Sequence, residues 1–365
     1  MKDSILLSPG DIITPAVTSL ENVGKFGLVD SLLSKEITIG GFVFLIRPHL
    51  TDQILSKYIF YVLSSDELID SIKNITKKSG SAFYNINKEA FKNLLFPVPP
   101  LQEQQRIVSK LDELFALIDK IEKEQDELEE YKKLAKEKVL ELAVTGKLVK
   151  QDPNDEPASV LLERIKKEKE ALVKAGKIKK DKADSEPLSD DDKNYSGNIA
   201  NNVLLLRLSD AGIWRSGSTP NRSNPFYYGG KIKWIKTGEL NNSIVNDSIE
   251  KITEKALAEC SLPINEPGNV LIAMYGATIG KLGIAGTELT TNQACCGCKP
   301  FNWIYNKYLF YYLMFYRKKF IESAEGGAQP NISREKILAT PFIVGSYNYQ
   351  IRVCKVLDYL FENLF

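Results

Sequence analysis

Histidine is almost absent from the 365-residue sequence, which contains only His49. Because imidazole is the commonest general base and a frequent metal ligand, this scarcity argues against histidine-based catalysis and histidine-ligated metals. No apolar run approaches the roughly 18 residues that a membrane span needs, and no basic start followed by an apolar segment marks the chain for export. We therefore expect a cytoplasmic protein with no membrane partner.

Cysteine is also scarce, with five residues that are mostly gathered in one segment. An odd, clustered set in a long chain is not a disulfide framework, so we expect reduced thiols. The run Cys295-Cys296-x-Cys298 raises the alternative of a zinc site, but no second pair or histidine lies at finger-like spacing. We favour a buried strand rich in small residues, with no metal and no cofactor.

Net charge is low, at +1, but the charges are unevenly distributed. Residues 193–365 carry 19 Lys and Arg against 13 Asp and Glu, a local charge of +6. Residues 101–192 carry 19 against 24, so an acidic middle masks a basic C-terminal region. Regional excess matters more than the sum for contact with phosphate, so the C-terminal region is the better candidate for binding a nucleic acid.

An internal repeat organises the chain. The segment "FYNINKEAFKNLLFPVPPLQEQQRIVSKLDELF", ending at Phe115, aligns without a gap on "QPNISREKILATPFIVGSYNYQIRVCKVLDYLF", ending at Phe361. Shorter matches upstream keep the same order, including "KYIFYVL" with "KYLFYYL" and "VGKFGL" with "IGKLGI". Such ordered self-similarity indicates a duplicated domain. The first copy lacks a counterpart of residues 205–258 and the second stops early in its final helix, so we expect both copies to be shortened.

Residues 101–145 hold the strongest periodic pattern. Apolar residues recur every seven positions from Ile107 to Leu142, with a second interleaved series that Gln125 and Lys132 interrupt. This pattern is typical of a coiled-coil seam. Pro99-Pro100 and Gly146 bound a helix that would span on the order of 65 Å at the usual rise per residue.

That helix has two interpretations. A plain amphipathic helix packed on its own domain is the simpler one, but so long a surface helix would leave its apolar stripe in water. We therefore favour pairing with another long helix, either the one starting near Tyr349 or one from another chain. The residues expected to bind that partner are Leu111, Leu114, Ile118, Ile121 and Leu128.

The whole pattern predicts an α+β protein with two repeated domains containing twisted sheets, joined by a long coiled-coil-forming spacer helix. After Gly146, "DPNDEPASVLLERIKKEKEALVKAGKIKK" predicts a capped, charged helix, and "DKADSEPLSDDDKNYSGN" predicts a polar linker. The expected divisions are a partial first domain at 1–98, the spacer helix at 99–148, a charged helix and linker at 149–203, a second domain at 204–345, and the start of a second spacer helix at 346–365.

The second domain carries an ordered set of short motifs. These are Gly217-Ser218-Thr219-Pro220, Tyr228-Gly229-Gly230, Trp234-Ile235, Gly238, Tyr275 to Lys281, Asn292-Gln293 and Gln329 to Ile332. The set resembles the target-recognition domain of the specificity subunit of type I restriction-modification systems. "PPLQEQQRIVSKLDELFALIDKIEKE" resembles that family's conserved helical spacer, and "GKLVKQDPNDEPASVLLERI" resembles its link into a second recognition domain.

The resemblance covers almost the whole chain and implies a subunit that reads double-stranded DNA and has no catalysis of its own. It implies two recognition domains separated by antiparallel conserved helices and reading a bipartite site. It also implies assembly with two modification methyltransferase subunits and, for cleavage, two motor-nuclease subunits. The sequence departs from the family pattern in its shortened first domain and its short final helix.

Two glycine-rich stretches suggest other chemistry. "GATIGKL" has three residues before Gly-Lys and then leucine, whereas a phosphate-binding P-loop has four residues and then Ser or Thr. We interpret it as a tight strand-to-strand turn that lets the backbone approach DNA. "NPFYYGG" echoes the Asn-Pro-Pro-Tyr motif of adenine methyltransferases, but it lacks the second proline and no glycine-rich cofactor loop accompanies it.

The candidate DNA-binding residues lie near the glycine turns, with Tyr227, Tyr228 and Trp234 interleaved among them. Lysines that alternate with apolar residues also fit a strand with one solvent-exposed face, which is the simpler interpretation of any single residue. Candidate phosphate contacts and supporting aromatics are Lys25, Arg215, Arg222, Tyr228, Lys231, Lys233, Lys236 and Lys281. Candidate base-edge readers are Ser218, Thr219, Asn241, Thr278, Asn292 and Gln293.

Two rival functions stay open at this point. One is a self-contained DNA methyltransferase, for which methyl transfer by the chain alone would be the test. The other is a truncated or half specificity cassette, which dimerises through residues 101–145 or serves as a recombination donor. The mass in solution separates that alternative from a complete subunit.

Overall fold

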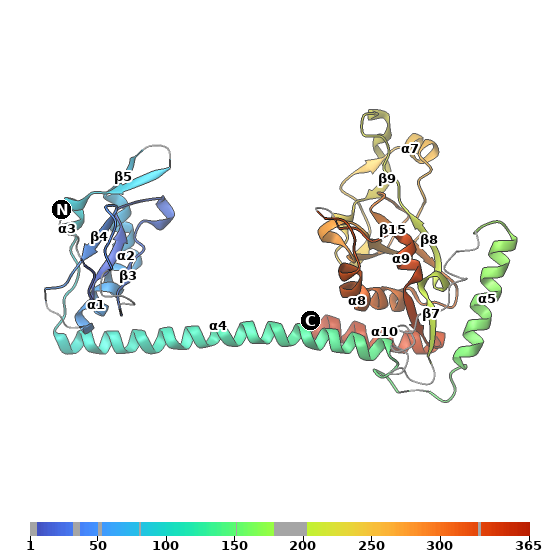
Figure 1. The fold of residues 1–365 in the computed structure, drawn as a ribbon, viewed down its shortest axis with the longest axis horizontal. Coiled ribbons are helices and arrows are strands. Elements are labelled where there is room, and N and C mark those ends of the chain that lie inside the picture. Colours follow the sequence, from blue (N-terminus) through green and yellow to red (C-terminus); the bar gives the residue numbers. More distant parts are fainter. Residues whose placement is uncertain are drawn as a thin grey trace. The chain divides into compact units, whose positions relative to one another are not determined.

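The computed structural model describes residues 6–31, 37–49, 53–79, 82–150, 152–178, 203–327 and 330–365. They form two compact units, Met1–Glu127 and Leu128–Phe365. Each unit combines sheets and helices, which confirms the α+β class (Figure 1). The predicted linker at residues 181–198 and Gln329 of the last motif lie outside the described residues. Within the described part of the chain, no helix is long and apolar enough to cross a membrane.

The first unit is built on a small antiparallel sheet of order β3-β1-β4. Its strands are β1 (Ile12–Pro15), β3 (Gly27–Leu28) and β4 (Val43–Ile46). A second sheet of order β2-β6-β5 contains β2 (Val17–Thr18), β5 (Thr76–Ser79) and β6 (Phe83–Ile86). The helices are α1 (Gln53–Leu63), α2 (Asp66–Asn74) and α3 (Lys88–Lys92). Val23, Ile72 and Ile86 form its buried cluster.

The second unit has a five-stranded sheet of order β10-β13-β12-β15-β8. Its strands are β8 (Gly212–Ser216), β10 (Ser243–Val245), β12 (Val270–Ala273), β13 (Leu282–Ala285) and β15 (Cys295–Pro300). A second sheet joins β9 (Tyr228–Ile235) to β11 (Lys251–Ile252) and β14 (Thr290–Thr291), while β7 (Leu204–Arg207) pairs with β16 (Pro341–Val344). The helices are α5 (Ala158–Lys174), α7 (Glu254–Glu259), α8 (Asn306–Glu322), α9 (Arg334–Ala339) and α10 (Tyr347–Asn363).

Each unit contains its own copy of the same three-stranded sheet, as the sequence repeat predicts. The order β3-β1-β4 in the first unit matches β13-β12-β15 in the second, and each of these pairs is antiparallel. In the second unit β10 and β8 flank this core on either side. Both flanking strands come from residues 205–258, the stretch that has no counterpart in the first copy.

Each copy also fixes its spacer helix by the same polar contacts. In the first copy, Asp112 accepts hydrogen bonds from Lys57 Nζ at 2.9 Å and from the Tyr61 hydroxyl at 2.5 Å. In the second, Asp358 accepts them from Lys307 Nζ at 2.6 Å and from the Tyr311 hydroxyl at 2.8 Å. Because the same lysine, tyrosine and aspartate types meet in both copies, the domain and the helix that follows it were duplicated as one piece.

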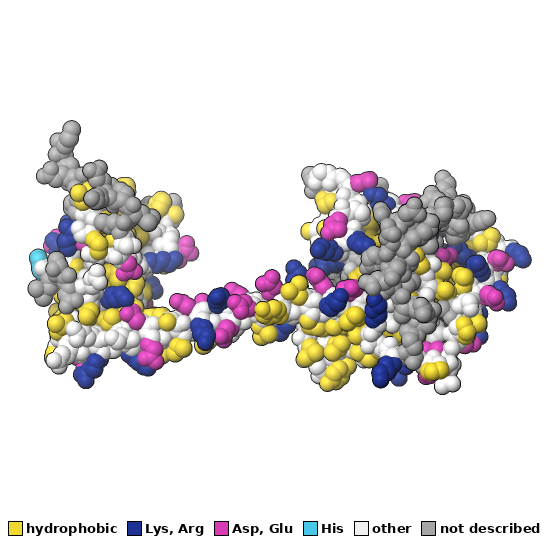
Figure 2. All heavy atoms as spheres, turned by 60° about the horizontal axis from the view of Figure 1, so that its bottom comes forward, with side chains coloured by type: hydrophobic (Ala, Val, Ile, Leu, Met, Phe, Trp, Pro, Cys, Tyr) yellow, Lys and Arg dark blue, Asp and Glu magenta, His cyan; other side chains and the backbone are white. Residues whose placement is uncertain are grey.

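The long helix α4 (Leu101–Val144) begins directly after Pro99-Pro100 and ends before Gly146, as predicted. Gly146 has a positive φ of 84°, which lets the amides of Lys147 and Leu148 donate to the Leu142 carbonyl at 2.8 and 2.9 Å. Acidic, basic and apolar side chains mix along its exposed surface (Figure 2). The sequence therefore placed both ends of this helix correctly.

The last turns of α4 pack on α10, the helix that contains Tyr349 (Figure 1). Leu140, Ala143 and Val144 share one buried core with Tyr349 and other residues of α10, and Lys136 lies 4.6 Å above the Phe361 ring. The partner helix is the one expected from the sequence, but the buried residues of α4 lie outside the predicted seam, of which only Val139 packs against this core. Within the chain, however, most of the expected partner-binding side chains are exposed: Leu114, Ile118, Ile121 and Leu128 by 44–53%, while Leu111 is half-buried.

Helix α5 corrects one expectation. The predicted cap is missing, because Pro157 occupies the N-cap position and makes no side-chain cap hydrogen bond. The helix is instead held by its sides: Leu161 and Ile165 are buried in the core of the second unit. Lys169 pairs with Asp210 at 2.9 Å. A charged sequence can thus dock tightly when its few apolar residues share one face.

Three of the cysteines lie in a buried strand, as predicted from their cluster in the sequence. Cys295, Cys296 and Cys298 are fully buried in β15, and the neighbouring Gly297 pairs with Arg215 of β8. Burial raises the pKa of the Cys296 thiol to about 12 and raises those of Cys295 and Cys298 as well. Because the thiolate is the reactive form, these side chains are structural and inert.

We expect a thiol-specific reagent at neutral pH to modify one cysteine of the native protein quickly, and that cysteine is the half-buried Cys260. The other four should react only after unfolding in guanidinium. The measurement is a colorimetric thiol titration, with Cys260→Ser as the variant that removes the fast phase. Rapid reaction of two or more thiols in native protein would contradict the burial of β15.

Candidate DNA interface

The stretch "MYGATIGKLGIAG" contains the connection between the antiparallel strands β12 and β13, at residues 274–281, and then β13 itself. Gly276 and Gly280 have φ values of 61° and 72°, and the amide of Gly280 donates to the Ala273 carbonyl at 2.9 Å. This geometry confirms the predicted strand-to-strand turn, while the approach of its backbone to DNA stays a prediction. The Thr278 hydroxyl donates to the Tyr275 carbonyl at 2.7 Å. Lys281, the residue after Gly280, is half-buried.

Two further side chains join this turn. The amide of Asn242 donates to the Leu282 carbonyl at 2.8 Å, and the exposed Asn241 and Lys281 each directly precede one residue of this pair. From α8, Arg317 reaches across Gly280 and donates through Nε to the Ile279 carbonyl at 3.3 Å. A Cβ on Gly280 would lie 2.5 Å from Arg317 Cγ, so the glycine makes room for the arginine.

Arg317 was missed by reasoning from sequence. It lies far along the chain from the turn, inside a largely apolar helix, and no motif marks it. The only available signal was the basic run Arg317-Lys318-Lys319, which interrupts the apolar pattern of α8. Together, Asn241, Thr278, Lys281 and Arg317 form what we call the turn cluster.

A second group of polar residues forms where the segment around Ser218 meets the segment around Asn292. The amide of Ser218 donates to the Thr291 carbonyl at 3.0 Å, and the Thr219 hydroxyl contacts Gln293 Oε1. Asn292 is held by its own amide, which donates to the Ile235 carbonyl at 3.0 Å. Ser218, Thr219, Asn292 and Gln293 thus lie together, and we call them the loop cluster. Thr219 and Gln293 are exposed.

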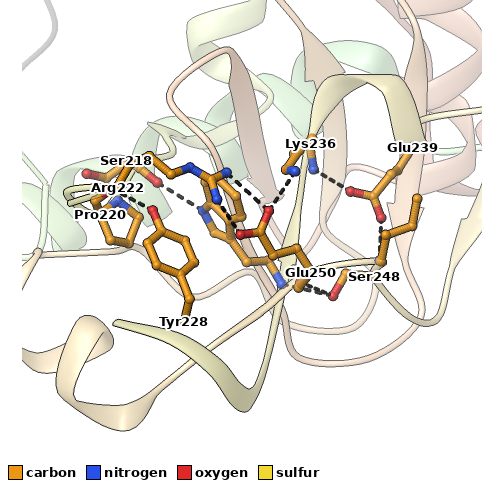
Figure 3. A network of polar contacts seen from close by, with 10 residues as sticks. Ser218, Pro220, Arg222, Tyr228, Lys236, Glu239, Ser248 and Glu250 are labelled. Atoms are coloured by element: carbon orange, nitrogen blue, oxygen red, sulfur yellow. Dashed lines mark hydrogen bonds and ion pairs between the residues drawn. The ribbon is translucent and has the colours of Figure 1, made fainter. Parts of the chain in front are cut away.

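Beside the loop cluster, Arg222 and Lys236 share one carboxylate (Figure 3). Both terminal nitrogens of Arg222 contact Glu250, the second at 3.1 Å, and Lys236 Nζ lies 2.6 Å from Glu250 Oε2. The Arg222 guanidinium holds the pKa of Glu250 below its usual range, and Lys236 adds to this. Two of the predicted phosphate contacts are therefore already engaged by an acid that the sequence did not single out.

The aromatic residues of this region have structural roles. Trp234 is buried, as expected for an apolar residue that alternates with the lysines of its strand. Its indole N–H donates to the Ser218 carbonyl at 3.0 Å, and the Tyr228 hydroxyl donates to the Pro220 carbonyl at 2.6 Å. The two rings meet edge to face at 6.1 Å. They fix the loop that presents Ser218 and Thr219.

The other predicted basic residues divide by exposure. Arg215 on β8 and Lys231 on β9 are exposed and make no ion pair among the described residues. Lys233 is half-buried and donates to the Thr287 hydroxyl at 3.2 Å. Lys25 belongs to the first unit, where it donates to Asn22 Oδ1 at 2.6 Å.

The methyltransferase-like "NPFY" stretch has a local structural explanation. Asn224 accepts a hydrogen bond from the amide of Phe226 at 3.1 Å and so caps the short turn Pro225–Tyr227. The Tyr227 hydroxyl donates to Glu259 at 2.9 Å. These contacts engage both polar side chains of the stretch in holding the turn.

The fold and the site together define a protein with a duplicated α+β domain. Its second copy gathers amide, hydroxyl and basic side chains around two glycine turns, which is the chemistry that reads and grips DNA. A model of the family described as "Type I restriction modification DNA specificity domain" matches residues 2–130 and 205–364. The chain belongs to this family, and the resemblance noted from its motifs is confirmed.

Several relatives and solved structures are similar to the chain. The type I restriction enzyme EcoAI specificity subunit of Escherichia coli is 26% identical, over 97% of this chain and 67% of that subunit. The EcoEI specificity subunit of the same organism is also 26% identical, over 87% and 61%. The chain thus spans about two thirds or less of the length of these relatives.

Two solved structures share the fold. The HsdS subunit from Thermoanaerobacter tengcongensis has a TM-score of 0.57 at 16% identity and covers 98% of this chain and 74% of its own. A structure described under complex assembly and conformational transition of the type I R-M system has a TM-score of 0.62 at 17% identity, covering 99% and 77%. At these identities the likeness establishes the fold.

Proposed function

We propose that this chain is the DNA-reading subunit of a type I restriction-modification complex and has no catalysis of its own. It reads a bipartite site through two recognition domains, residues 1–98 and 204–345, held apart by helices at 99–148 and 346–365. The observation that carries the proposal is that the two stretches matched by the family model contain the same sheet core, β3-β1-β4 and β13-β12-β15.

Within the second domain we assign two kinds of contact. Exposed or partly free cations contact phosphates and so position the domain on the duplex. Such contacts carry no sequence information of their own. Side chains with both donors and acceptors read base edges. The positioning residues are Arg215, Lys231, Lys281 and Arg317, with Lys25 in the first domain; the readers are Ser218, Thr219, Asn241, Thr278, Asn292 and Gln293.

Catalysis is proposed to come from partner subunits. EcoAI and EcoEI name specificity subunits of type I restriction enzymes, so we propose methyltransferase subunits for modification and motor-nuclease subunits for cleavage. The apolar stripe Leu111, Leu114, Ile118, Ile121 and Leu128 on α4 fits a helix of such a partner or of a second copy, because half-exposed leucine and isoleucine gain from being covered. A DNA ligand and reduced thiols fit the cytoplasm.

The test is DNA binding by the chain assembled with its methyltransferase subunits. A library of duplexes containing paired half-sites at different spacings should yield one selected sequence class, bound less tightly as salt rises. A complex that binds all duplexes equally, or that binds none, would exclude the proposed function. Methyl transfer by the chain alone would instead support the rival methyltransferase.

Arg317→Ala should weaken DNA binding and reduce the slope of log affinity against log salt by about 0.9, because one phosphate contact is lost. The measurement is fluorescence anisotropy at several KCl concentrations. Lys355→Ala, which removes an exposed cation from α10, is the matched control and should leave the slope unchanged. If the two variants have equal salt slopes, Arg317 does not contact DNA phosphate.

A further inference from the structure

Glu250 lies between two cations at the edge of the loop cluster (Figure 3). Its carboxylate contacts both terminal nitrogens of Arg222 and the ammonium of Lys236. The Arg222 side chain is nevertheless 51% exposed, and that of Glu250 is 23% exposed. The pair is therefore open to solvent on one side and available to exchange partners.

The guanidinium of Arg222 is also held by aromatic faces. Its Cζ lies 4.5 Å from the Tyr228 ring centroid and 5.0 Å from that of Trp234. Those rings are tied to Pro220 and Ser218 by the hydrogen bonds described above. Stacking and the two-pronged contact with Glu250 thus fix Arg222 beside the loop that carries Ser218 and Thr219.

A planar carboxylate with two oxygens occupies here the place that a DNA phosphate would take in front of an arginine and a lysine. Both groups are anionic and accept paired hydrogen bonds from a guanidinium. DNA that approaches this edge has to displace Glu250 or meet its negative charge. Cations already paired with protein also release fewer counterions on binding.

We propose that Glu250 is a specificity-determining residue that competes with DNA phosphate for Arg222 and Lys236. It lowers affinity for arbitrary DNA, so that stable binding depends on the base contacts of the loop cluster. The inference rests on the proposed DNA-reading function and adds to it a residue outside both clusters. Substituting glutamine removes the charge and keeps the size of the side chain.

The experiment measures binding of the full chain to a 30-base-pair duplex of mixed sequence, by fluorescence anisotropy over a range of KCl concentrations. Glu250→Gln should bind roughly three- to tenfold tighter than wild type, with a salt slope steeper by about 1 to 2 because one or two phosphate contacts are gained. Adding Arg222→Ala to Glu250→Gln should remove most of that gain. Thermal melting of each variant checks that the fold is retained.

Glu266→Gln is the matched control. Glu266 pairs with Lys299 at 2.6 Å on the same unit, and both side chains are about half exposed, so its substitution changes the net charge equally. If Glu250→Gln gains no more affinity than Glu266→Gln, the effect is one of overall charge and the proposal is overturned. Absence of salt-dependent binding by every variant, alone and assembled with methyltransferase subunits, would overturn the proposed function and this inference with it.

Discussion

Gly217→Ala should destabilise the second unit by about 3 kcal/mol and disrupt the loop cluster. A Cβ at this position would overlap the carbonyl oxygens of Thr291 and Asn292, which are backbone atoms and cannot rotate away. The two segments would have to separate, carrying Ser218 and Thr219 away from Gln293. We therefore expect sequence-selective DNA binding to fall with stability.

The measurement is urea denaturation followed by tryptophan fluorescence. All three tryptophans, Trp214, Trp234 and Trp303, belong to the second unit, so the signal reports on that unit alone. Gly238→Ala is the control, because no atom lies within 4 Å of a Cβ built there. Equal midpoints for the two variants would show that the close approach at Gly217 is not needed.

Trp234→Ala should cost about 3–5 kcal/mol of unfolding free energy, the usual loss for a large aromatic side chain removed from a core. Trp234 is 1% exposed and packs with Ile252, Ala256 and Leu262. It also supports Arg222 and donates to the Ser218 carbonyl. Trp234→Phe keeps most of the apolar contact and loses the indole hydrogen bond, so its cost should be about 1–2 kcal/mol.

Far-UV circular dichroism in urea measures these losses without depending on the fluorescence of the residue removed. Phe226→Ala is the control, since Phe226 is 71% exposed and its truncation should change stability by less than about 0.5 kcal/mol. If the unfolding free energy of Trp234→Ala lies within about 1 kcal/mol of wild type, Trp234 is not a core residue that supports the loop carrying Ser218 and Thr219.

Local signals in the sequence predicted the features that depend on neighbours along the chain. The heptad pattern, Pro99-Pro100 and Gly146 located α4, because helix ends are set by residues within one turn of them. The glycines of "GATIGKLG" indicated a turn, since positive φ is a property of single residues. The repeat predicted that both units contain the same sheet core, because similar sequences bury the same apolar positions.

Contacts between distant segments could not be read in the same way. Arg317 reaches the turn cluster from α8, and Glu250 meets Arg222 from a segment 28 residues further along the chain, with no spacing rule to connect them. The alternation of lysines and apolar residues places Trp234 on the apolar face of β9, but it does not reveal that Ala256 of α7 and Leu262 cover that face. The docking of α5 likewise depends on Leu161 and Ile165 meeting a core formed elsewhere.

Methylome sequencing of a host that carries this chain with its methyltransferase subunits tests the central claim most directly. The account predicts one new methylated motif of two half-sites at fixed spacing, absent without the chain. It also predicts that the half-site read by the second domain is altered or lost when Thr219 and Gln293 are both replaced by alanine. No new motif, or an unchanged motif in the double variant, would contradict the claim that this chain reads DNA through the loop cluster.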